Sequence, residues 1–288
     1  MNTIIQNKIE AILNEKIVNE FSVSGGCISD AKIINTETGK HFFLKSNNNN
    51  PSKMFLNEAN GLKELEKSNT IRVPKVISAA DDYILLEVIS SSSKSKHFFE
   101  DFGRNFAEIH KHTNEQYGFY ENNYIGSLPQ INIPENMELY DWPSFYFNKR
   151  LKFQINLAEN NGYLTDELSS AFSKLENKIE SILSNNNEKP ALLHGDLWSG
   201  NFIIDENGSA CLIDPAVYYG NREADLAMTK LFGGFDNIFY SAYNEYFPLP
   251  EGCNYRENIY KLYHVLNHLN LFGQSYYHQA LNLIRYYL

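Results

Sequence analysis

The amino-acid sequence predicts an α+β fold with two lobes, an antiparallel-sheet N-lobe followed by a mainly helical C-lobe that contains one β-hairpin. Short β-rich segments separated by turns dominate the first 89 residues, and amphipathic helical patterns dominate the rest. The third observation is an Asn-Gly turn between two short apolar runs, a strong hairpin signal inside the helical part. We therefore expect residues 1–89 to form the N-lobe and residues 90–288 the C-lobe.

The N-lobe pattern begins with an amphipathic helix, because Lys8 and Glu10 interrupt the apolar residues at the start of the chain. A helix is also expected over residues 54–66, where Phe55 and Leu62 belong to an apolar stripe. Extended segments are predicted at residues 21–23, 28–34, 41–45, 73–74 and 83–89. The Ser-rich stretch 90–95 has the composition of a linker between the lobes.

The C-lobe pattern is mostly helical, with one β-rich island. Helices are predicted over residues 98–111, 142–159, 165–183, 224–232 and 255–272. The island consists of residues 191–193, then a loop, and then two runs, 202–204 and 210–213, joined by the turn 205–208.

Charge and cysteine content exclude several classes of function. Lys and Arg total 25 against 35 Asp and Glu, a net charge of −10, which argues against nucleic acid or an anionic membrane as the main partner. No apolar stretch is long enough to span a bilayer, and the first residues do not resemble a signal peptide. The three cysteines, Cys27, Cys211 and Cys253, form no C-x-x-C pair, so we expect a cytoplasmic protein without disulfides or structural zinc.

The hairpin brings chemically useful side chains together. Asp196 and Asn201 lie in the loop before its first run, and Asp214 follows its second run, so all three should lie at the same end of the hairpin. Carboxylate and amide oxygens suit Mg²⁺ bound with the phosphates of a nucleotide. The spacing His-x-Asp-x-x-x-x-Asn from His194 matches the catalytic loop of kinases, in which the Asp is the base and the Asn binds metal. The alternative is that these residues only form turns.

A carboxylate on the apolar stripe of helix 54–66 gives independent support. Burying Glu58 without a partner would be costly, and Lys45 at the end of the strand 41–45 is equally out of place alone. A Lys45–Glu58 ion pair solves both problems and directs the ammonium towards nucleotide phosphates. In the alternative interpretation Glu58 lies at the edge of the stripe and is solvated.

Two further N-lobe segments are weaker candidates for nucleotide binding. Gly25 and Gly26 form a turn whose backbone can approach phosphates, although most such pairs are ordinary turns. Glu87 and Ile89 lie where a kinase hinge would offer backbone groups to adenine, but a buried strand would look the same. Cys27, beside the glycines, is either a redox-sensitive thiol or a small apolar loop residue.

The acceptor should be a small molecule. Protein kinases have a long activation segment after the metal-binding Asp, and it orders a peptide substrate. Here only residues 215–222 separate Asp214 from the next predicted helix. That span is too short for a peptide platform.

Several segments in chain order resemble one family closely. The chain is similar to the fructosamine and ketosamine 3-kinases, within the aminoglycoside-phosphotransferase-like branch of the protein-kinase-like fold. The segments that carry the resemblance are GGCIS at 25–29, RVP at 72–74, DWP at 141–143, LLHGDLWSGN at 192–201, DPA at 214–216, FGGF at 232–235 and LNH at 266–268. Ser24, where the family often has a third glycine, and the Asn-rich loop 47–50 depart from the pattern.

The resemblance implies transfer of the γ-phosphate of ATP to the C3 hydroxyl of a ketoamine, which is a sugar bound through nitrogen to an amine or a protein lysine. The phosphorylated adduct then falls apart, so the activity repairs glycation. By position, Asp196 would be the base, Asn201 and Asp214 would hold Mg²⁺, and Lys45 with Glu58 would orient phosphates. The residues expected to line the acceptor pocket are Trp198, His268, Asp141 and Trp142; plain core packing is the alternative for Trp198 and His268. Asp225 is expected to brace the catalytic loop.

Two rival functions remain open at this stage. One is a kinase for another small amino-alcohol or an aminoglycoside, and the other is a non-catalytic nucleotide-binding module. The intact set of Lys45, Asp196, Asn201 and Asp214 disfavours the second. The expected cofactors are ATP and Mg²⁺, and the protein is expected to be a monomer or homodimer.

Overall fold

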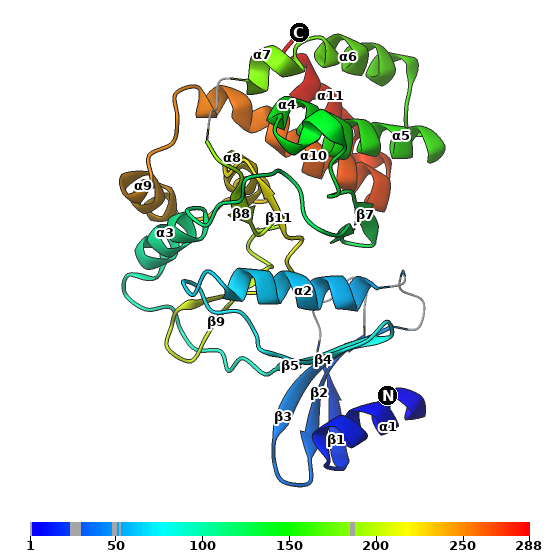
Figure 1. Cartoon of the computed structure of the whole chain (residues 1–288), viewed down its shortest axis with the longest axis vertical. Coiled ribbons are helices and arrows are strands. Elements are labelled where there is room, and N and C mark those ends of the chain that lie inside the picture. Colours follow the sequence, from blue (N-terminus) through cyan, green and yellow to red (C-terminus); the bar gives the residue numbers. More distant parts are fainter. Residues whose placement is uncertain (1, 24–29, 48–50, 52, 185–187) are drawn as a thin grey trace.

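The computed structural model describes residues 2–23, 30–47, 51, 53–184 and 188–288. A five-stranded sheet lies at one end of the molecule, and a group of helices forms the other end (Figure 1). Helix α2, Met54–Glu66, lies between the sheet and the helical part. The predicted α+β fold with a sheet-containing N-lobe and a helical C-lobe is therefore confirmed.

The sheet is antiparallel throughout, in the order β1-β2-β3-β5-β4. Its strands are β1 Ile17–Ser22, β2 Asp30–Thr36, β3 His41–Ser46, β4 Val76–Ala79 and β5 Tyr83–Glu87. The strand predicted at residues 73–74 starts later, at Val76. Pro74 has no N–H to donate to a strand ladder, which explains the delay.

The two faces of the sheet are covered by different helices, as Figure 1 shows. Alternate residues of β5 separate the two cores: Leu85 packs with helix α1, Thr3–Leu13, while Ile84 packs with helix α2, Met54–Glu66. The larger core continues from α2 into the helical part of the molecule. The helix predicted over residues 54–66 is confirmed at both ends.

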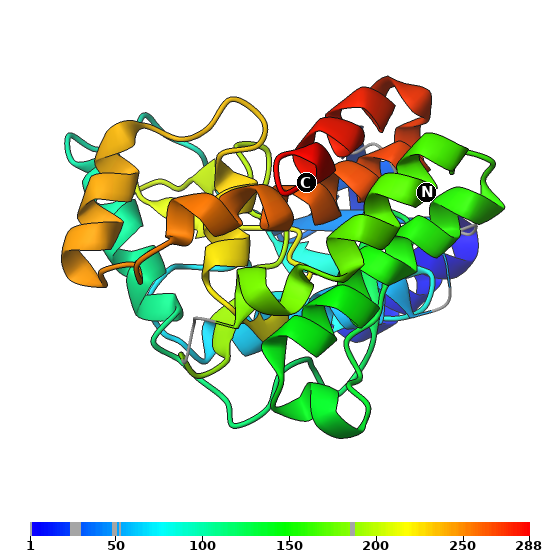
Figure 2. The same ribbon diagram turned by 90° about the horizontal axis from the view of Figure 1, so that it is seen from above.

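The C-lobe helices cross over one another around a large aromatic-rich core, seen from above in Figure 2. They are α3 Phe98–Ile109, α4 Trp142–Tyr146, α5 Phe153–Asn160, α6 Asp166–Glu176, α7 Ile179–Leu183, α8 Glu223–Thr229, α9 Asn237–Tyr246, α10 Cys253–Phe272 and α11 Tyr277–Arg285. Short helical turns are η1 Asn136–Leu139, η2 Phe147–Lys152 and η3 Gln274–Tyr276. None of the helices within the described part of the chain is long and apolar enough to cross a membrane.

Most predicted helices are present, but their continuity differs. The segment predicted as one helix over 142–159 contains the π-helical turn η2 between α4 and α5. The segment 165–183 breaks into α6 and α7. Helices α9 and α11 were not predicted, although α11 buries Ala280, Leu281 and Ile284 at helical spacing.

The predicted hairpin is confirmed. Strand β9, Phe202–Ile204, pairs with β10, Ala210–Leu212, and the intervening turn contains Gly208 at a positive φ of 75°. Strand β8, Ala191–Leu193, pairs instead with β11, Tyr218–Gly220, so the loop before the hairpin and the segment after it are also held together. A third small ladder joins β6, Asn123–Ile125, to β7, Leu128–Gln130.

Candidate active site

The two ends of the β9–β10 hairpin meet, as the sequence predicts. The backbone N–H of Ile213 donates to the carbonyl of Asn201 at 3.1 Å, which places Asp214 directly beside the catalytic loop. The side-chain amide of Asn201 donates to the backbone carbonyl of Asp196 at 2.8 Å and to its carboxylate at 3.1 Å. This leaves the Asn201 amide oxygen available as a metal ligand. Asp196, Asn201 and Asp214 therefore form one cluster of oxygen donors.

Asp225, in the first turn of α8, fixes the start of the catalytic loop. Its buried carboxylate accepts hydrogen bonds from the backbone N–H groups of His194, at 2.7 Å, and Gly195, at 2.8 Å. The imidazole of His110 lies 3.3 Å away on the other side. Although burial favours the neutral acid, these donors lower the pKa of Asp225, so it is a carboxylate at neutral pH. The expected bracing role of Asp225 is confirmed.

The ring of His194 connects the loop that carries Asp196 to Ile213, the residue that follows β10. Its Nδ1 accepts from the N–H of Asp196 at 3.3 Å, and its Nε2 lies 3.0 Å from the carbonyl of Ile213. This network assigns the neutral tautomer with the proton on Nε2. Burial lowers the pKa of His194, which agrees with a neutral ring. The ring of His194 therefore connects the loop to the end of β10.

Glycine is required at position 195. Its φ is +83°, and a Cβ there would lie 2.0 Å from the carbonyl oxygen of Ala216. The catalytic loop and the segment after Asp214 thus approach more closely than any side chain allows. Asp214 itself has φ of 55°, a left-handed conformation that Asp tolerates better than most residues.

Lys45 on β3 reaches two carboxylates, one from each lobe. Its ammonium lies 2.8 Å from Glu58 on α2 and also pairs with Asp214. Burial favours the neutral amine, but the charges of Asp214 and Glu58 outweigh it and raise the pKa of Lys45. The sequence-predicted Lys45–Glu58 pair is present, with both side chains mostly buried.

Asp196 lies in an environment that disfavours its charged form. Burial and the neighbouring charge of Asp214 raise its pKa well above the usual range, against the opposing hydrogen bond from Asn201. A carboxylate with a raised pKa accepts a proton more readily than an exposed one. The position of Asp196 is therefore suited to a general base.

Arg72 links the expected adenine side of the cleft to the hairpin. Its guanidinium pairs with Glu87 at the end of β5, and with Glu206 at 2.7 Å and Asp205 at 3.4 Å in the hairpin turn. Its carbonyl also accepts from the N–H of Leu212 in β10, at 2.9 Å. Sequence analysis assigned no role to Arg72 beyond its place in the RVP segment.

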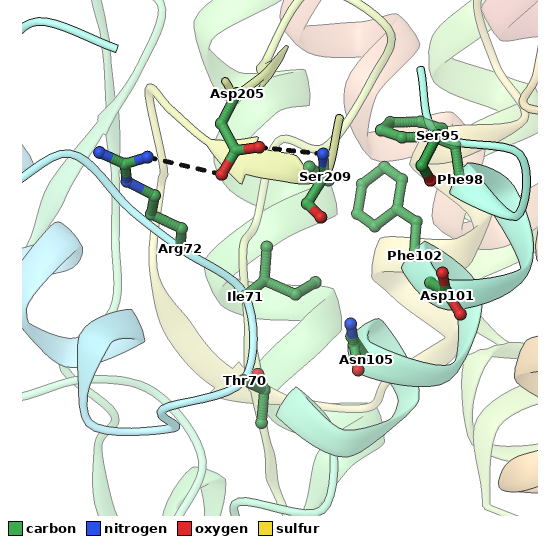
Figure 3. Close-up of a pocket in the computed structure, with 11 residues that line it drawn as sticks. Thr70, Ile71, Arg72, Ser95, Phe98, Asp101, Phe102, Asn105, Asp205 and Ser209 are labelled. Carbon is green, nitrogen blue, oxygen red and sulfur yellow. Dashed lines mark hydrogen bonds and ion pairs between the residues drawn. The ribbon is translucent and has the colours of Figure 1, made fainter. Parts of the chain in front are cut away.

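The interlobe segment is tied to the same turn. The hydroxyl of Ser92 donates to the carbonyl of Asp205 at 2.7 Å, and the N–H of Ser95 donates to the carbonyl of Gly208 at 3.1 Å. Between these contacts and helix α3 lies a pocket of about 210 Å³ (Figure 3). Figure 3 shows Arg72 and Ser209 on opposite sides of Asp205, and Phe98 and Phe102 on the α3 side of the pocket.

Of the hinge candidates, Glu87 ends β5 and Ile89 follows that strand. The carboxylate of Glu87 is occupied by Arg72 and by the backbone N–H of Lys75, at 2.9 Å. The backbone N–H of Glu87 is also occupied, by the carbonyl of Lys75 at 2.9 Å, and the adenine-binding role of Glu87 and Ile89 stays a prediction. Gly25, Gly26 and Cys27 lie outside the described residues.

Two of the four acceptor candidates lie beside the catalytic loop. Trp198 is 37% exposed, and its ring makes an edge contact with Phe232, with centroids 6.2 Å apart. His268 on α10 contacts the other side of Phe232, at 4.6 Å. Trp198 and His268 thus belong to one aromatic group, joined through Phe232.

Asp141 and Trp142 have packing roles instead. Asp141 caps α4 by accepting from the N–H of Ser144 at 3.0 Å. Trp142 is only 3% exposed, and its indole N–H donates to the hydroxyl of Tyr260 at 3.0 Å. Both line a separate pocket of about 340 Å³, and neither Asp196 nor Trp198 lines that pocket. We therefore do not include Asp141 and Trp142 in the acceptor site. In the DWP segment, Asp141 caps the start of α4 and Pro143 lies in its first turn.

His110 is a supporting residue that sequence analysis missed. It follows α3 and is buried between Asp225 and the hydroxyl of Tyr243, which lies 2.7 Å from Nδ1. The available signal was a lone histidine that continues the apolar stripe of Phe102 and Phe106. A polar residue on such a stripe needs a buried partner.

Comparison with known proteins places this site in a family. The fructosamine kinase family model matches residues 1–288. The chain belongs to the fructosamine kinase family. It is 39% identical over 274 residues to the chloroplastic protein-ribulosamine 3-kinase of Arabidopsis thaliana, covering 93% of this chain and 82% of that protein.

Solved structures agree with the fructosamine kinase assignment. A putative fructosamine-3-kinase from Thermobifida fusca superposes with a TM-score of 0.87 at 29% identity, covering 98% of this chain and 97% of that one. The phosphotransferase APH(2")-IIa, solved with streptomycin and ATP, superposes with a TM-score of 0.62 at 16% identity, over 99% of this chain and 96% of that one. The second likeness shows the shared fold alone.

Replacing Arg72 should weaken nucleotide binding in this fructosamine kinase family member. Arg72→Met removes the link between the end of β5 and the hairpin turn, so the adenine side of the cleft loses its fixed position relative to Asn201 and Asp214. We expect the KM for ATP to rise several-fold, with a smaller change in the KM for the acceptor. Steady-state kinetics with each substrate varied in turn measures this.

The matched control for Arg72 is Glu206→Gln, which removes only the exposed partner and should change the KM for ATP less than twofold. Equal KM values for ATP in Arg72→Met and the unmodified protein would show that the link has no role in nucleotide binding.

His264 on α10 should make stability depend on pH. Its Nδ1 is buried without a hydrogen-bond partner, and burial, with the nearby His268 and Arg150, lowers its pKa to about 3 against the opposing charge of Asp225. In the unfolded chain this histidine has a pKa near 6.5, so it binds a proton at a higher pH there than in the folded protein. The folded protein therefore keeps its full stability above about pH 6.5 and loses stability as the pH falls towards 3. From pH 7 to pH 5 the loss from this residue is about 2 kcal/mol.

His264→Leu should therefore reduce the fall in the free energy of unfolding between pH 7 and pH 5, measured by urea denaturation. The control His278→Leu replaces an exposed histidine of α11 and should leave the fall unchanged. A fall of the same size in His264→Leu and in the unmodified protein would contradict the assignment of this buried neutral ring.

Proposed function

We propose that this protein transfers the γ-phosphate of ATP to the C3 hydroxyl of a ketoamine, a sugar joined through nitrogen to an amine or a lysine side chain. The observation that carries the proposal is the convergence of Asp196, Asn201 and Asp214 at one end of the hairpin, with Lys45 paired across the cleft. Membership of the fructosamine kinase family and the 39% identity to a ribulosamine 3-kinase support the acceptor class.

In this proposal Asp196 receives the proton of the acceptor hydroxyl as that oxygen attacks the γ-phosphorus. The bond between the γ-phosphorus and the bridging oxygen of ADP breaks in the same displacement. The Asn201 amide holds the Asp196 carboxylate in place, and the raised pKa of Asp196 favours its acceptance of the proton. Asp225 and His194 keep the loop from moving during the transfer.

The oxygen atoms of Asp214 and Asn201 fit Mg²⁺, which in kinase sites is held by one or two protein side chains together with phosphate oxygens. Among the described residues no group of three or more His, Cys, Asp or Glu side chains could hold a metal alone. The metal would neutralise charge on the phosphates, and Lys45, oriented by Glu58, would bind them from the N-lobe side.

The segment after Asp214 supports a small acceptor. It runs directly into β11, Tyr218–Gly220, and α8 begins at Glu223. The β11–β8 pairing holds this segment against the C-lobe, so it cannot extend to bind a peptide. A glycated lysine would enter as a side chain only. The cytoplasmic location and the monomeric or homodimeric state stay predictions.

An ADP-release assay with ribulosyl- and fructosyl-amines, in the presence and absence of Mg²⁺, tests the proposal. We expect Mg²⁺-dependent turnover with at least one ketoamine and a product phosphorylated at C3 of the sugar, identified by NMR. Turnover with an aminoglycoside or choline but with no ketoamine would replace the proposed acceptor class. ATP binding without turnover of any acceptor would favour a non-catalytic module.

Asp196→Asn should abolish proton acceptance while keeping the loop folded, because an amide oxygen can still accept the hydrogen bond from Asn201. We expect kcat to fall by about 10²- to 10⁴-fold with little change in ATP affinity, measured by isothermal titration. The control Asp166→Asn makes the same change at an exposed site on α6. Full activity in Asp196→Asn would exclude Asp196 as the base.

A further inference from the structure

A continuous group of aromatic rings leads away from the catalytic loop. We call it the aromatic shelf, and it comprises Trp198, Phe232, His268, Phe272 and Tyr276. Phe232 lies between Trp198, at 6.2 Å, and His268, at 4.6 Å between ring centroids. His268 in turn contacts Phe272 at 5.3 Å and Tyr276 at 5.2 Å.

The shelf is built on rigid elements. His268 and Phe272 are four residues apart on α10 and therefore lie on the same face of that helix. Tyr276 ends the helical turn η3, and Phe232 follows α8, which packs against α10. The Nδ1 of His268 lies 2.8 Å from the carbonyl of His264, which fixes the ring, and burial lowers the pKa of His268, so the ring is neutral at pH 7.

Part of the shelf is open to solvent. Phe272 is 55% exposed and Trp198 37%, while the rings between them are partly buried. Aromatic side chains grouped on an exposed surface are typical of binding sites, whereas single exposed ones are common everywhere. Trp198, the first ring, lies two residues after Asp196 in the chain, which places the start of the shelf in the loop that carries the proposed base.

We propose that the aromatic shelf binds the N-substituent of the ketoamine, that is, the alkylammonium chain to which the sugar is attached. This inference rests on the proposed function and deepens it. The shelf favours ketoamines with an extended aliphatic substituent, such as the side chain of lysine, over those with a small substituent.

Charge and shape support this occupant. The ketoamine nitrogen is a secondary amine and carries a proton near neutral pH, and aromatic faces attract such cations. The methylene groups beyond the nitrogen can cover the rings of Phe272 and Tyr276. The neighbouring cations Lys230 and Lys261 both pair with Glu257, which limits their repulsion of a positively charged ligand.

Phe272→Leu tests the proposal, because leucine keeps apolar bulk at the end of α10 but removes the aromatic face. The measurement is kcat/KM for two ribulosyl-amines, one made from methylamine and one from Nα-acetyl-lysine. We expect the lysine-to-methylamine ratio of kcat/KM to fall roughly 3- to 10-fold in Phe272→Leu. Phe272→Trp keeps an aromatic face and should keep the ratio.

The matched control is Tyr286→Leu. Tyr286 is an exposed aromatic residue whose ring contacts that of Tyr255 in a tilted arrangement. Tyr255 lies near the opposite end of α10, about 25 Å from Phe272 along the helix. This variant should leave the ratio unchanged.

The outcomes separate the two proposals. If the unmodified protein uses neither ribulosyl-amine, the proposed function fails. If it uses both, but Phe272→Leu lowers kcat/KM for the two equally or for neither, the acceptor class stands and the shelf is not the site of the N-substituent.

Discussion

The active site depends on one buried carboxylate. Asp225 accepts two backbone hydrogen bonds from the loop that carries Asp196, and His110 supports it from behind. Two N–H groups directed at one anion define the orientation of a short backbone segment more strictly than apolar packing can. The position of the proposed base, and with it the position of Asn201, whose amide donates to Asp196, follows from this interaction. The start of the loop is thus fixed relative to α8.

The cleft combines charges that would be unstable apart. Lys45, Glu58 and Asp214 come from β3, α2 and the segment after the hairpin. The buried side chains of Lys45 and Glu58 each need the charge of the other, and the half-exposed Asp214 adds a second anion beside the ammonium. Burial raises the pKa of Glu58, while the ammonium of Lys45 opposes this shift. A kinase needs such an arrangement because a fixed cation is most effective towards phosphate when water is largely excluded.

The parts of the site that could be predicted from sequence are those fixed by local rules. The Asn-Gly turn specifies a hairpin, a hairpin specifies that its ends meet, and Glu58 on an apolar stripe requires a cation. The parts that could not be predicted depend on contacts between distant segments. Nothing local to Arg72 indicates that it meets Asp205, and nothing local to Trp142 indicates that Tyr260 takes up its indole N–H. Family resemblance suggested an acceptor role for Trp142, which its burial does not support.

The contacts of Ser92 and Ser95 with the hairpin turn show that part of the Ser-rich stretch is held in place. Its composition is that of a flexible tether, yet from Ser92 onwards it is fastened to the hairpin whose ends bring Asn201 and Asp214 together. Arg72, which precedes β4, makes a second connection to the same hairpin, through its carbonyl to Leu212 and through its guanidinium to Glu206. A rotation of the sheet against the helical body would have to break or carry along both connections, so the serine-rich composition understates how firmly the two parts are held in one orientation.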